Sequence, residues 1–447
     1  MMILTTTPIT TDHEDCEPET IAPLLQERLS EELKDLCRRI GEVGDAMKMP
    51  VYAVGGVPRD VLLGRPTFDL DVVVEGDGIA FAERLVAEWG GRVVPHKRFK
   101  TAIVACPDGR KVDVATARRE RYEYPAALPV VEPSALTQDL YRRDFTINSM
   151  AVQLNHDRYG RLSDFFGGRR DLTLGIIRVL HTLSFIEDPT RILRAVRFEQ
   201  RYGFRVDSET EHLLNSAVEA RILEQVPGQR LRDEILLILK EDDPLPALLR
   251  LDRFGVFQAI SSQWTIERER LTSLFREIHR TIDWFDLLYP GQRVEGWILY
   301  LLGVVEETPA NGRMSICRRL NFHKQAMEAV RIVAMEGERI EEHLATQDDL
   351  RPSRIYRMLS HVPPDVTLFL MARTTHEVVR RRISLYFDRL QVVRTAISGD
   401  DLRQMGIPQG PIYRKILGEV LASRLDGQVQ SKEEELLLSR RLWEHLE

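Results

Sequence analysis

Two acidic residues separated by one position form a candidate metal-binding pair. Asp69 and Asp71 lie in the sequence FDLDVVVE, whose apolar, β-branched character predicts a strand. Side chains at positions i and i+2 share one face of a strand, so both carboxylates point to one side while Leu70, Val72 and Val74 point into the core. Neighbouring carboxylates repel each other, and their hard oxygen atoms suit Mg²⁺. Two such ions activate an attacking hydroxyl and stabilise a leaving pyrophosphate, so the pair predicts nucleotidyl transfer.

A glycine pair precedes these acids in the sequence VYAVGGVPRDVLLG. The run VYAV predicts a strand that ends at Gly55 and Gly56, and Pro58 suits the first turn of a following helix. Glycines at a strand-to-helix turn let backbone N–H groups approach a phosphate, and the helix N-terminus adds favourable dipole charge. Arg59 supplies a full positive charge beside the turn. The turn is therefore a candidate nucleotide-binding site.

Neither motif is specific alone, because Asp-x-Asp is common in proteins and a glycine pair is a weaker signal still. The ordered set of a strand, the glycine pair, an arginine, a helix and then the acidic pair on the next strand is much more specific. A third acid, Asp113 in KVDVATA, lies on a strand expected to pair near the strand of Asp69 and Asp71. Asp113 is a candidate third catalytic acid, and the alternative is a structural strand residue.

The elements that must hold these residues change character along the chain. Residues 1–20 are threonine-rich and acidic and predict a loose tail, and residues 21–49 predict one amphipathic helix. Strands are predicted for VYAV, FDLDVVV, GRVVP, TAIVAC and KVDVATA, and helices for VPRDVLLG and IAFAERLVAEWG. Beyond about residue 165 only helices are predicted. The expected fold class is α+β, with a small mixed sheet followed by an all-helical region.

Composition restricts the class of protein. The chain has 447 residues, of which 43% are hydrophobic and 29% charged, as in ordinary globular proteins. No apolar run approaches the roughly 18 residues that span a bilayer, and the first twenty residues resemble no secretory signal, so we expect a cytoplasmic protein without a membrane partner. The four cysteines show no CxxC spacing and predict reduced thiols. The net charge of −7 excludes a uniformly basic surface but leaves open a local positive groove.

The stretch GGVPRDVLLGRPTFDLDVVVEG resembles the head-domain signature of the polymerase-β-like nucleotidyltransferases, close to GGxVRDxLLGxxxxDxD, specifically of class II tRNA nucleotidyltransferases and bacterial poly(A) polymerases. Pro58 departs from this pattern, but proline is compatible with a first helical turn. RRDFTINSMA resembles the family motif RRDFTINAxA, which implies that Arg143 contacts the nucleotide and that Asp144 and Asn148 organise the sugar and the hinge. Class II members depend mainly on two acids, so the resemblance leaves the role of Asp113 open.

The stretch EDPTRILRAVRFEQRYGF predicts a helix capped by Asp188, with Pro189 at its first position. Arg191, Arg194 and Arg197 recur at spacings of three and predict either a phosphate-facing stripe or a solvated basic face. The stretch resembles the class II EDxxR motif, which implies that Asp188 and Arg191 hydrogen-bond the incoming base, and that Arg194 and Arg197 contact the triphosphate or this pair. A carboxylate and a guanidinium together suit the edges of C and A.

The resemblance also implies the order of domains. A catalytic head with a leading helix is expected over residues 21–165, a helical neck that recognises the base over 166–245, a helical body over 246–395 and a helical tail over 396–447. The tail sequence ISGDDLRQMGIPQGPIYRKILGEV is similar to the tail of long class II tRNA nucleotidyltransferases. Residues 313–331 carry five basic residues against one acidic residue, and residues 373–394 carry six against two, so each has a net charge of +4. These clusters are candidate contacts for the acceptor stem and T-arm, or ordinary surface helices.

The function that the resemblance implies is addition of C and A, or of only one of them, to the tRNA 3′ end from CTP and ATP, with two Mg²⁺ ions as cofactor. The stretches RRERYEYPAALPVVEP and DPTRILRAVRFEQRYGF are similar to members that add only A. One alternative is a bacterial poly(A) polymerase acting on general RNA 3′ ends. An alternative of another class is a non-catalytic RNA-binding protein on the same fold. The sequence leaves the oligomeric state open.

Overall fold

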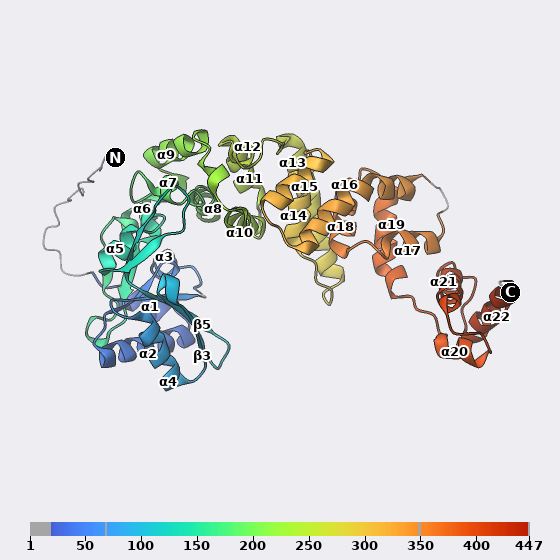
Figure 1. Ribbon diagram of the computed structural model, residues 1–447, viewed down its shortest axis with the longest axis horizontal. Coiled ribbons are helices and arrows are strands. Elements are labelled where there is room, and N and C mark those ends of the chain that lie inside the picture. The colour runs from blue at the N-terminus through green and yellow to red at the C-terminus, as the bar shows by residue number, and fades with distance from the viewer. Residues whose placement is uncertain (1–18, 68, 347–349, 446–447) are drawn as a thin grey trace. The chain divides into compact units, whose positions relative to one another are not determined.

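The structure is a computed structural model that describes residues 19–67, 69–346 and 350–445. The chain divides into two compact units, Met1–Val226 and Pro227–Glu447 (Figure 1). The first unit contains all the strands that the structure describes and all the candidate catalytic and nucleotide-binding residues. In the described part of the chain, no helix has the length and apolar character needed to cross a bilayer.

Most of the tail predicted over residues 1–20 lies outside the described residues, but its last two residues are attached to the first unit. The Leu162 N–H donates to the Glu19 carbonyl oxygen at 2.8 Å, and Thr20 forms an antiparallel bridge with Arg161. Helix α1 begins directly after this attachment, at Ala22.

Seven strands form the main sheet in the order β3-β4-β5-β2-β1-β8-β9, in which β2 and β5 are parallel and all other neighbours are antiparallel. The strands of this mixed sheet are β1 (Val51–Val54), β2 (Leu70–Val74), β3 (Arg92–His96), β4 (Thr101–Ala105), β5 (Lys111–Thr116), β8 (Met150–Gln153) and β9 (Leu162–Asp164). Two small sheets pair β6 (Arg118–Arg121) with β7 (Val130–Pro133) and β10 (Ile176–Ile177) with β11 (Arg205–Val206). The five strands predicted from the sequence are confirmed. The β10–β11 pair corrects the expectation of helices only beyond residue 165.

The helices of the first unit cover this sheet and continue beyond it (Figure 1). They are α1 (Ala22–Arg28), α2 (Glu31–Met47), α3 (Gly56–Leu63), α4 (Gly78–Trp89), α5 (Leu136–Tyr141), α6 (Gly168–Leu174), α7 (Ser184–Glu187), α8 (Arg191–Tyr202) and α9 (Ser208–Glu219), with short 3₁₀ turns at Lys97–Phe99, Thr146–Asn148, His156–Arg158 and Ile222–Gln225. The single helix predicted over residues 21–49 is wrong. Two helices occur instead, because Leu29 is extended and the Ser30 hydroxyl accepts the Leu33 N–H to cap α2.

One face of the sheet carries both an apolar cluster and the candidate acids. Val73 of β2 packs there with Tyr52 and Val54 of β1 and with Leu136 and Leu140 of α5. Asp71 lies two residues before Val73 and therefore faces the same side. The sheet thus places α5, and the residues that follow it, on the face that bears the acidic side chains.

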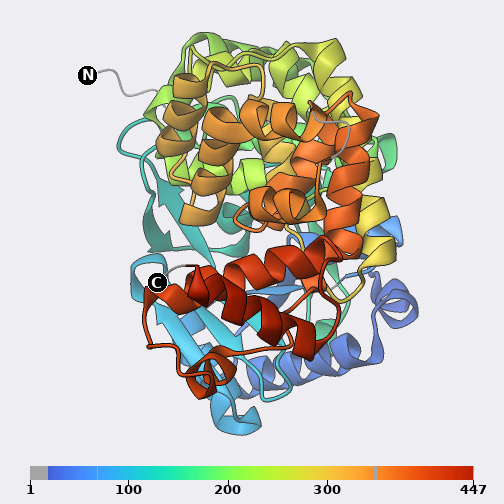
Figure 2. The same cartoon turned by 90° about the vertical axis from the view of Figure 1, so that its right-hand side faces the viewer.

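The second unit contains only helices among its described residues. They are α10 (Gly228–Leu239), α11 (Leu245–Arg253), α12 (Val256–Ile260), α13 (Arg268–Leu288), α14 (Gly296–Val305), α15 (Ala310–Arg319), α16 (Lys324–Ala345), α17 (Pro352–Leu359), α18 (Pro364–Arg373), α19 (Glu377–Asp388), α20 (Gly399–Gln404), α21 (Pro411–Leu425) and α22 (Lys432–Glu444), with a 3₁₀ turn at Leu390–Val392. Figure 2 shows α20, α21 and α22 together in red. Leu402 of α20 and Ile416 and Val420 of α21 belong to one apolar cluster, against which side chains of α22 pack.

Candidate active site

The candidate acids gather on adjacent strands. The parallel pairing of β2 with β5 places Asp71 in register with Asp113, and Asp69 comes directly before β2. Burial raises the pKa of the Asp71 carboxyl, and the negative charges of Asp113 and Asp69 act in the same direction. The positive charges of Arg143 and Arg59 oppose this rise but do not cancel it. The structure therefore concentrates negative charge around Asp71.

A divalent cation fits the chemistry of this cluster. Carboxylate oxygens are the ligands that Mg²⁺ prefers, and the charges of Asp113 and Asp69 add to burial in raising the pKa of Asp71. Over the described ranges, no group of three or more His, Cys, Asp or Glu side chains is already arranged to hold a metal ion. Binding of a metal ion by Asp69 and Asp71, with Asp113 beside them, stays a prediction.

The backbone at Gly55 comes close to the same carboxylate. Gly55 caps the N-terminus of α3 with φ +66° and ψ −108°, a conformation that residues with a side chain rarely adopt. A Cβ atom there would lie 3.3 Å from Asp71 Oδ2 and 3.4 Å from Arg143 Nη1. Gly56 follows as the first residue of α3. The glycine pair thus leaves a space bordered by a carboxylate, a guanidinium and a helix N-terminus.

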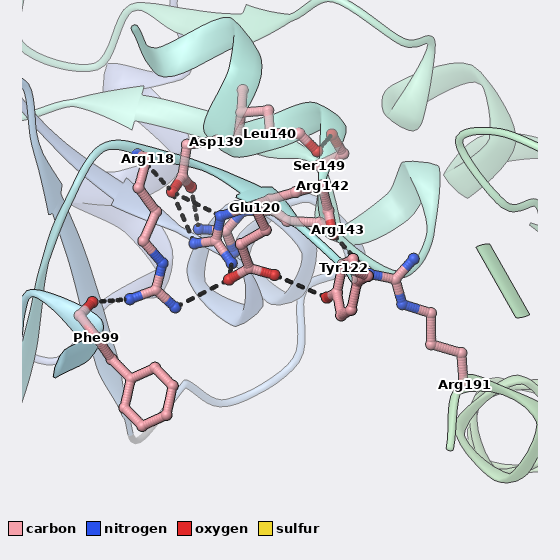
Figure 3. Close-up of polar contacts among 10 residues, drawn as sticks. All are labelled: Phe99, Arg118, Glu120, Tyr122, Asp139, Leu140, Arg142, Arg143, Ser149 and Arg191. Atoms are coloured by element: carbon pink, nitrogen blue, oxygen red, sulfur yellow. Dashed lines mark hydrogen bonds and ion pairs between the residues drawn. The ribbon is translucent and has the colours of Figure 1, made fainter. Parts of the chain in front are cut away.

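A buried carboxylate holds Arg143 in this position (Figure 3). Asp139 of α5 is fully buried, and its Oδ2 accepts from Arg143 Nη2 at 3.0 Å. Its Oδ1 accepts from Nη2 and Nε of Arg142 at 2.7 and 3.1 Å. Burial alone would raise the pKa of Asp139, but the charges of Arg143 and Arg142 outweigh it and lower the pKa. Asp139 is therefore ionised and fixes both arginines.

The same network continues into the β6 strand (Figure 3). Oε1 of Glu120 accepts from Arg142 Nη1 at 2.8 Å and from Arg118 Nη2 at 3.1 Å, and its Oε2 accepts from the Tyr122 hydroxyl at 2.8 Å. Asp139, Glu120 and Tyr122 were not predicted from the sequence to be functional. Arg118 and Glu120 alternate along β6, and Tyr122 follows at the same spacing just after its end; this pattern was a signal that could have identified part of the network.

Of the two candidate base-reading residues, Asp188 lies in the turn between α7 and α8, and Arg191 is the first residue of α8. Arg191 is buried, and it donates from Nη1 to Ser184 Oγ and from Nη2 to the Arg142 carbonyl oxygen, both at 2.6 Å. Oδ1 of Asp188 accepts from the backbone N–H and the hydroxyl of Thr190 at 3.0 and 2.6 Å. The predicted cap is wrong, because Thr190 is the N-cap of α8, and Asp188 closes the turn before it. Recognition of a base by Asp188 and Arg191 stays a prediction.

Arg194 and Arg197, the other two arginines of the predicted stripe, turn toward the protein. Arg194 pairs with Oδ2 of Asp144 through Nε at 2.9 Å and Nη2 at 2.5 Å, and the Arg197 guanidinium lies 4.7 Å from the Phe198 ring centre. Burial would raise the pKa of Asp144, but Arg194 and the hydrogen bond from Asn148 lower it to about 2. The alternative of a solvated basic face is wrong, because Arg191 and Arg197 are only 5% and 6% exposed.

Arg59 also points inward. Its Nη1 donates to Asn148 Oδ1 at 2.6 Å, and its Nε and Nη2 donate to the Asp60 carboxylate, both at 2.9 Å. Asn148 in turn donates to Asp144 Oδ1 at 3.0 Å. The residues predicted to bind the nucleotide are thus joined from Arg59 through Asn148 and Asp144 to Arg194. Direct contact of Arg59 with a phosphate stays a prediction.

Both candidate basic clusters of the second unit are partly neutralised. Arg313 and Arg373 each bond to Glu306, at 3.0 and 3.1 Å, and Arg331 pairs with Glu328 at 2.9 Å. Arg382 is buried and donates to a backbone carbonyl oxygen of α16. The net charge of +4 counted for each cluster therefore overstates the positive charge that is exposed. Contact of these clusters with tRNA stays a prediction.

His181 gives this region a testable pH response. The Nε2 atom of His181 lies 3.4 Å from Glu187 Oε2, and its ring centre lies 5.2 Å from the ring centre of Tyr141. Burial is the main cause that lowers the pKa of His181 to about 4, and the positive charge of Arg191 acts in the same direction. In the unfolded chain the pKa of this histidine is 6.5. Below pH 6.5 the unfolded state therefore binds a proton that the folded state does not bind until about pH 4. The contribution of His181 to stability is thus complete above pH 6.5 and is lost as the pH falls toward 4.

We expect the unaltered chain to lose on the order of 3 kcal/mol more unfolding free energy than His181→Gln between pH 7 and pH 4. Urea unfolding of both proteins over this pH range measures the difference. Parallel pH profiles for the two proteins would show that His181 is not held neutral.

Comparison with known proteins identifies the family. Residues 51–178 match the family described as poly A polymerase head domain, and residues 203–265 match a family described as a probable RNA and SrmB-binding site of polymerase A. An A-adding tRNA nucleotidyltransferase of Geobacter sulfurreducens is 45% identical over 94% of this chain, which spans only 48% of that relative. An A-adding tRNA nucleotidyltransferase of Halalkalibacterium halodurans is 31% identical over 97% of this chain and 98% of its own length.

A solved structure, the Thermotoga maritima CCA-adding enzyme complexed with tRNA, superimposes with a TM-score of 0.74 at 34% identity, covering 96% of this chain and 99% of that one. The similarity confirms the predicted α+β head followed by helices. Together with the motifs of the first unit, these findings show that the chain belongs to the tRNA nucleotidyltransferase family.

Proposed function

We propose that this chain transfers AMP from ATP to the 3′ end of tRNA. The observation that carries the proposal is the register of Asp71 with Asp113 on parallel strands, with Asp69 beside them and with Gly55 and Arg143 bordering the same space. Addition of A rather than C is supported by the names of the two curated relatives and by the similarity of two stretches of this sequence to A-adding members. Addition of the full CCA sequence is the second candidate, because the Thermotoga maritima relative is named for it.

The candidate residues can divide the work of one displacement. The oxygen of the RNA 3′-hydroxyl forms a bond to the α-phosphorus of ATP, the bond from this phosphorus to the pyrophosphate oxygen breaks, and pyrophosphate leaves. Mg²⁺ bound by Asp69 and Asp71 would lower the pKa of the hydroxyl and neutralise charge on the triphosphate. Asp113 is the neighbouring carboxylate available to accept the hydroxyl proton.

The triphosphate needs positive charge at a fixed position. Arg143 supplies it, because Asp139 holds its Nη2 while its Nη1 faces the space at Gly55. We further propose that Asp188 and Arg191 recognise the adenine edge, since a carboxylate accepts from the exocyclic amine and a guanidinium donates to a ring nitrogen. ATP and tRNA are cytoplasmic molecules, so the proposed reaction belongs in the cytoplasm.

Extension of three tRNA transcripts tests the product. The transcripts end before CCA, after C and after CC, and each is incubated with Mg²⁺ and either labelled ATP or labelled CTP. We expect one A on the transcript that ends in CC and no C on any transcript. Incorporation of C would indicate CCA or CC addition, and long A tails would indicate a poly(A) polymerase. Binding of tRNA without any incorporation would contradict the proposed function.

Removal of one proposed metal ligand tests the acidic pair. Asp71→Asn keeps the shape of the side chain but removes its charge, so we expect kcat to fall about 100-fold or more. Mg²⁺ should also raise the melting temperature of the unaltered chain more than that of Asp71→Asn, because a cation that binds the folded state stabilises it. Asp157, whose side chain is 99% exposed, supplies the control Asp157→Asn, which should behave like the unaltered chain. Equal activity of both variants would remove Asp71 from the reaction.

The space at Gly55 is tested by adding a side chain. In Gly55→Ala the new Cβ would lie 3.3 Å from the Asp71 carboxylate in an unfavourable backbone conformation, so we expect kcat/KM to fall about 10-fold or more. Gly64 ends the same helix in the ordinary left-handed conformation, where asparagine is tolerated, so Gly64→Asn is the matched control. Both variants are compared by primer extension and by circular dichroism. Full activity of Gly55→Ala would show that the space is not used.

A further inference from the structure

Four aromatic side chains of the first unit form a continuous row, which we call the aromatic strip. It runs from His181 through Tyr141 and Phe166 to Phe165. The successive ring centres are 5.2, 5.7 and 6.3 Å apart. The rings come from three places in the chain, namely the end of α5, the segment between β9 and α6, and the segment before α7 (Figure 1). Contact between three separate segments makes the strip a feature of the tertiary fold.

The strip is only partly explained by packing. Phe166 packs against the apolar cluster that Val73, Tyr52 and Leu136 form on one face of the main sheet, so this ring has a structural role. Tyr141 and Phe165, however, are 39% and 41% exposed. Leu183, two residues after His181 in the chain, is 52% exposed. Large apolar side chains gathered at a surface commonly mark a binding site. The exposed rings are therefore a candidate binding surface.

The aromatic strip lies beside Arg191, one of the candidate nucleotide-binding residues. Tyr141 directly precedes Arg142, whose carbonyl oxygen accepts from Arg191 Nη2 at 2.6 Å. His181, at the end of the strip, is close enough to Arg191 for that charge to act on its ring. Any molecule that lies along the strip therefore ends beside the arginine proposed to recognise the incoming base.

We propose that the aromatic strip stacks the unpaired bases at the 3′ end of the tRNA and so directs the terminal hydroxyl toward Asp69 and Asp71. This inference rests on the proposed function. Unpaired RNA bases stack on aromatic side chains without requiring a particular sequence, which suits an end that is recognised by its position. A protein partner is less compatible with this location, because it would cover the place that the RNA end must reach.

Fluorescence of a modified tRNA tests the inference without depending on activity. A transcript carries 2-aminopurine at its first unpaired 3′ position, and the fluorescence of this base falls when it stacks on an aromatic ring. We expect the full chain to quench it and the double variant Tyr141→Ser with Phe165→Ser to quench it much less. In primer extension the same variant should raise KM for tRNA at least about fivefold and leave KM for ATP unchanged.

Matched variants separate stacking from general loss of apolar surface. Tyr141→Phe with Phe165→Trp keeps both rings and should restore quenching and KM. Leu174→Ser removes another exposed apolar side chain of the first unit, 51% exposed, and should change neither. If the double serine variant is insoluble, Phe165→Ser alone is measured, because this ring is the more exposed of the two.

Each outcome bears on the inference. Absence of quenching by the unaltered chain, or equal quenching by the serine variant, overturns it. An altered oligomeric state of the serine variant with unchanged tRNA binding would assign the strip to self-association and would also overturn it. Failure of the unaltered chain to add any nucleotide would contradict the proposed function, whereas the quenching measurement would still decide whether the strip stacks RNA.

Discussion

Repulsion between carboxylates on two adjacent parallel strands is the constraint on which the first unit depends. The register of β2 with β5 fixes Asp71 opposite Asp113, and Asp69 adds a third negative charge nearby. Cations near such a cluster favour its charged form. Arg143 supplies one such cation from the protein, and the carboxylate oxygens suit the divalent ion that we propose to bind there with the triphosphate.

Arg143 can serve this purpose only because another carboxylate controls its orientation. Asp139 lies on α5, and α5 packs on the same face of the sheet as Asp71 through Leu136 and Leu140. The same buried carboxylate also binds Arg142, whose carbonyl oxygen binds Arg191. The acids and the candidate base-reading arginine are therefore connected by packing and hydrogen bonds within one unit. A change at Asp139 would leave two partly buried guanidinium groups without their shared partner, so it would affect both ends of the site together.

The sequence predicted those parts of the site whose geometry depends on residues that are neighbours in the chain. Alternation along a strand predicted that Asp69 and Asp71 share a face, and turn chemistry predicted the strand-to-helix turn at Gly55. Tertiary contacts controlled the rest. The inward orientation of Arg191 and Arg197 follows from partners that are distant in sequence, and helical spacing cannot distinguish a solvated basic face from a buried one. Asp139 and Glu120 were missed because their importance arises only when α5 and β6 are brought together.

Counts of charge along the sequence are poor guides to RNA contacts in this chain. An arginine attracts a phosphate less strongly when neighbouring carboxylates neutralise part of its positive charge. Arg313 of one basic cluster and Arg373 of the other share Glu306, so each cluster, with a net charge of +4 in sequence, presents less positive charge to solvent. Aromatic side chains have no such compensation, because stacking requires only an accessible ring face. Uncharged rings such as Tyr141 and Phe165 suit the role that we propose for them, because they can stack an RNA end beside a cluster of acids without neutralising the carboxylates proposed to hold the metal.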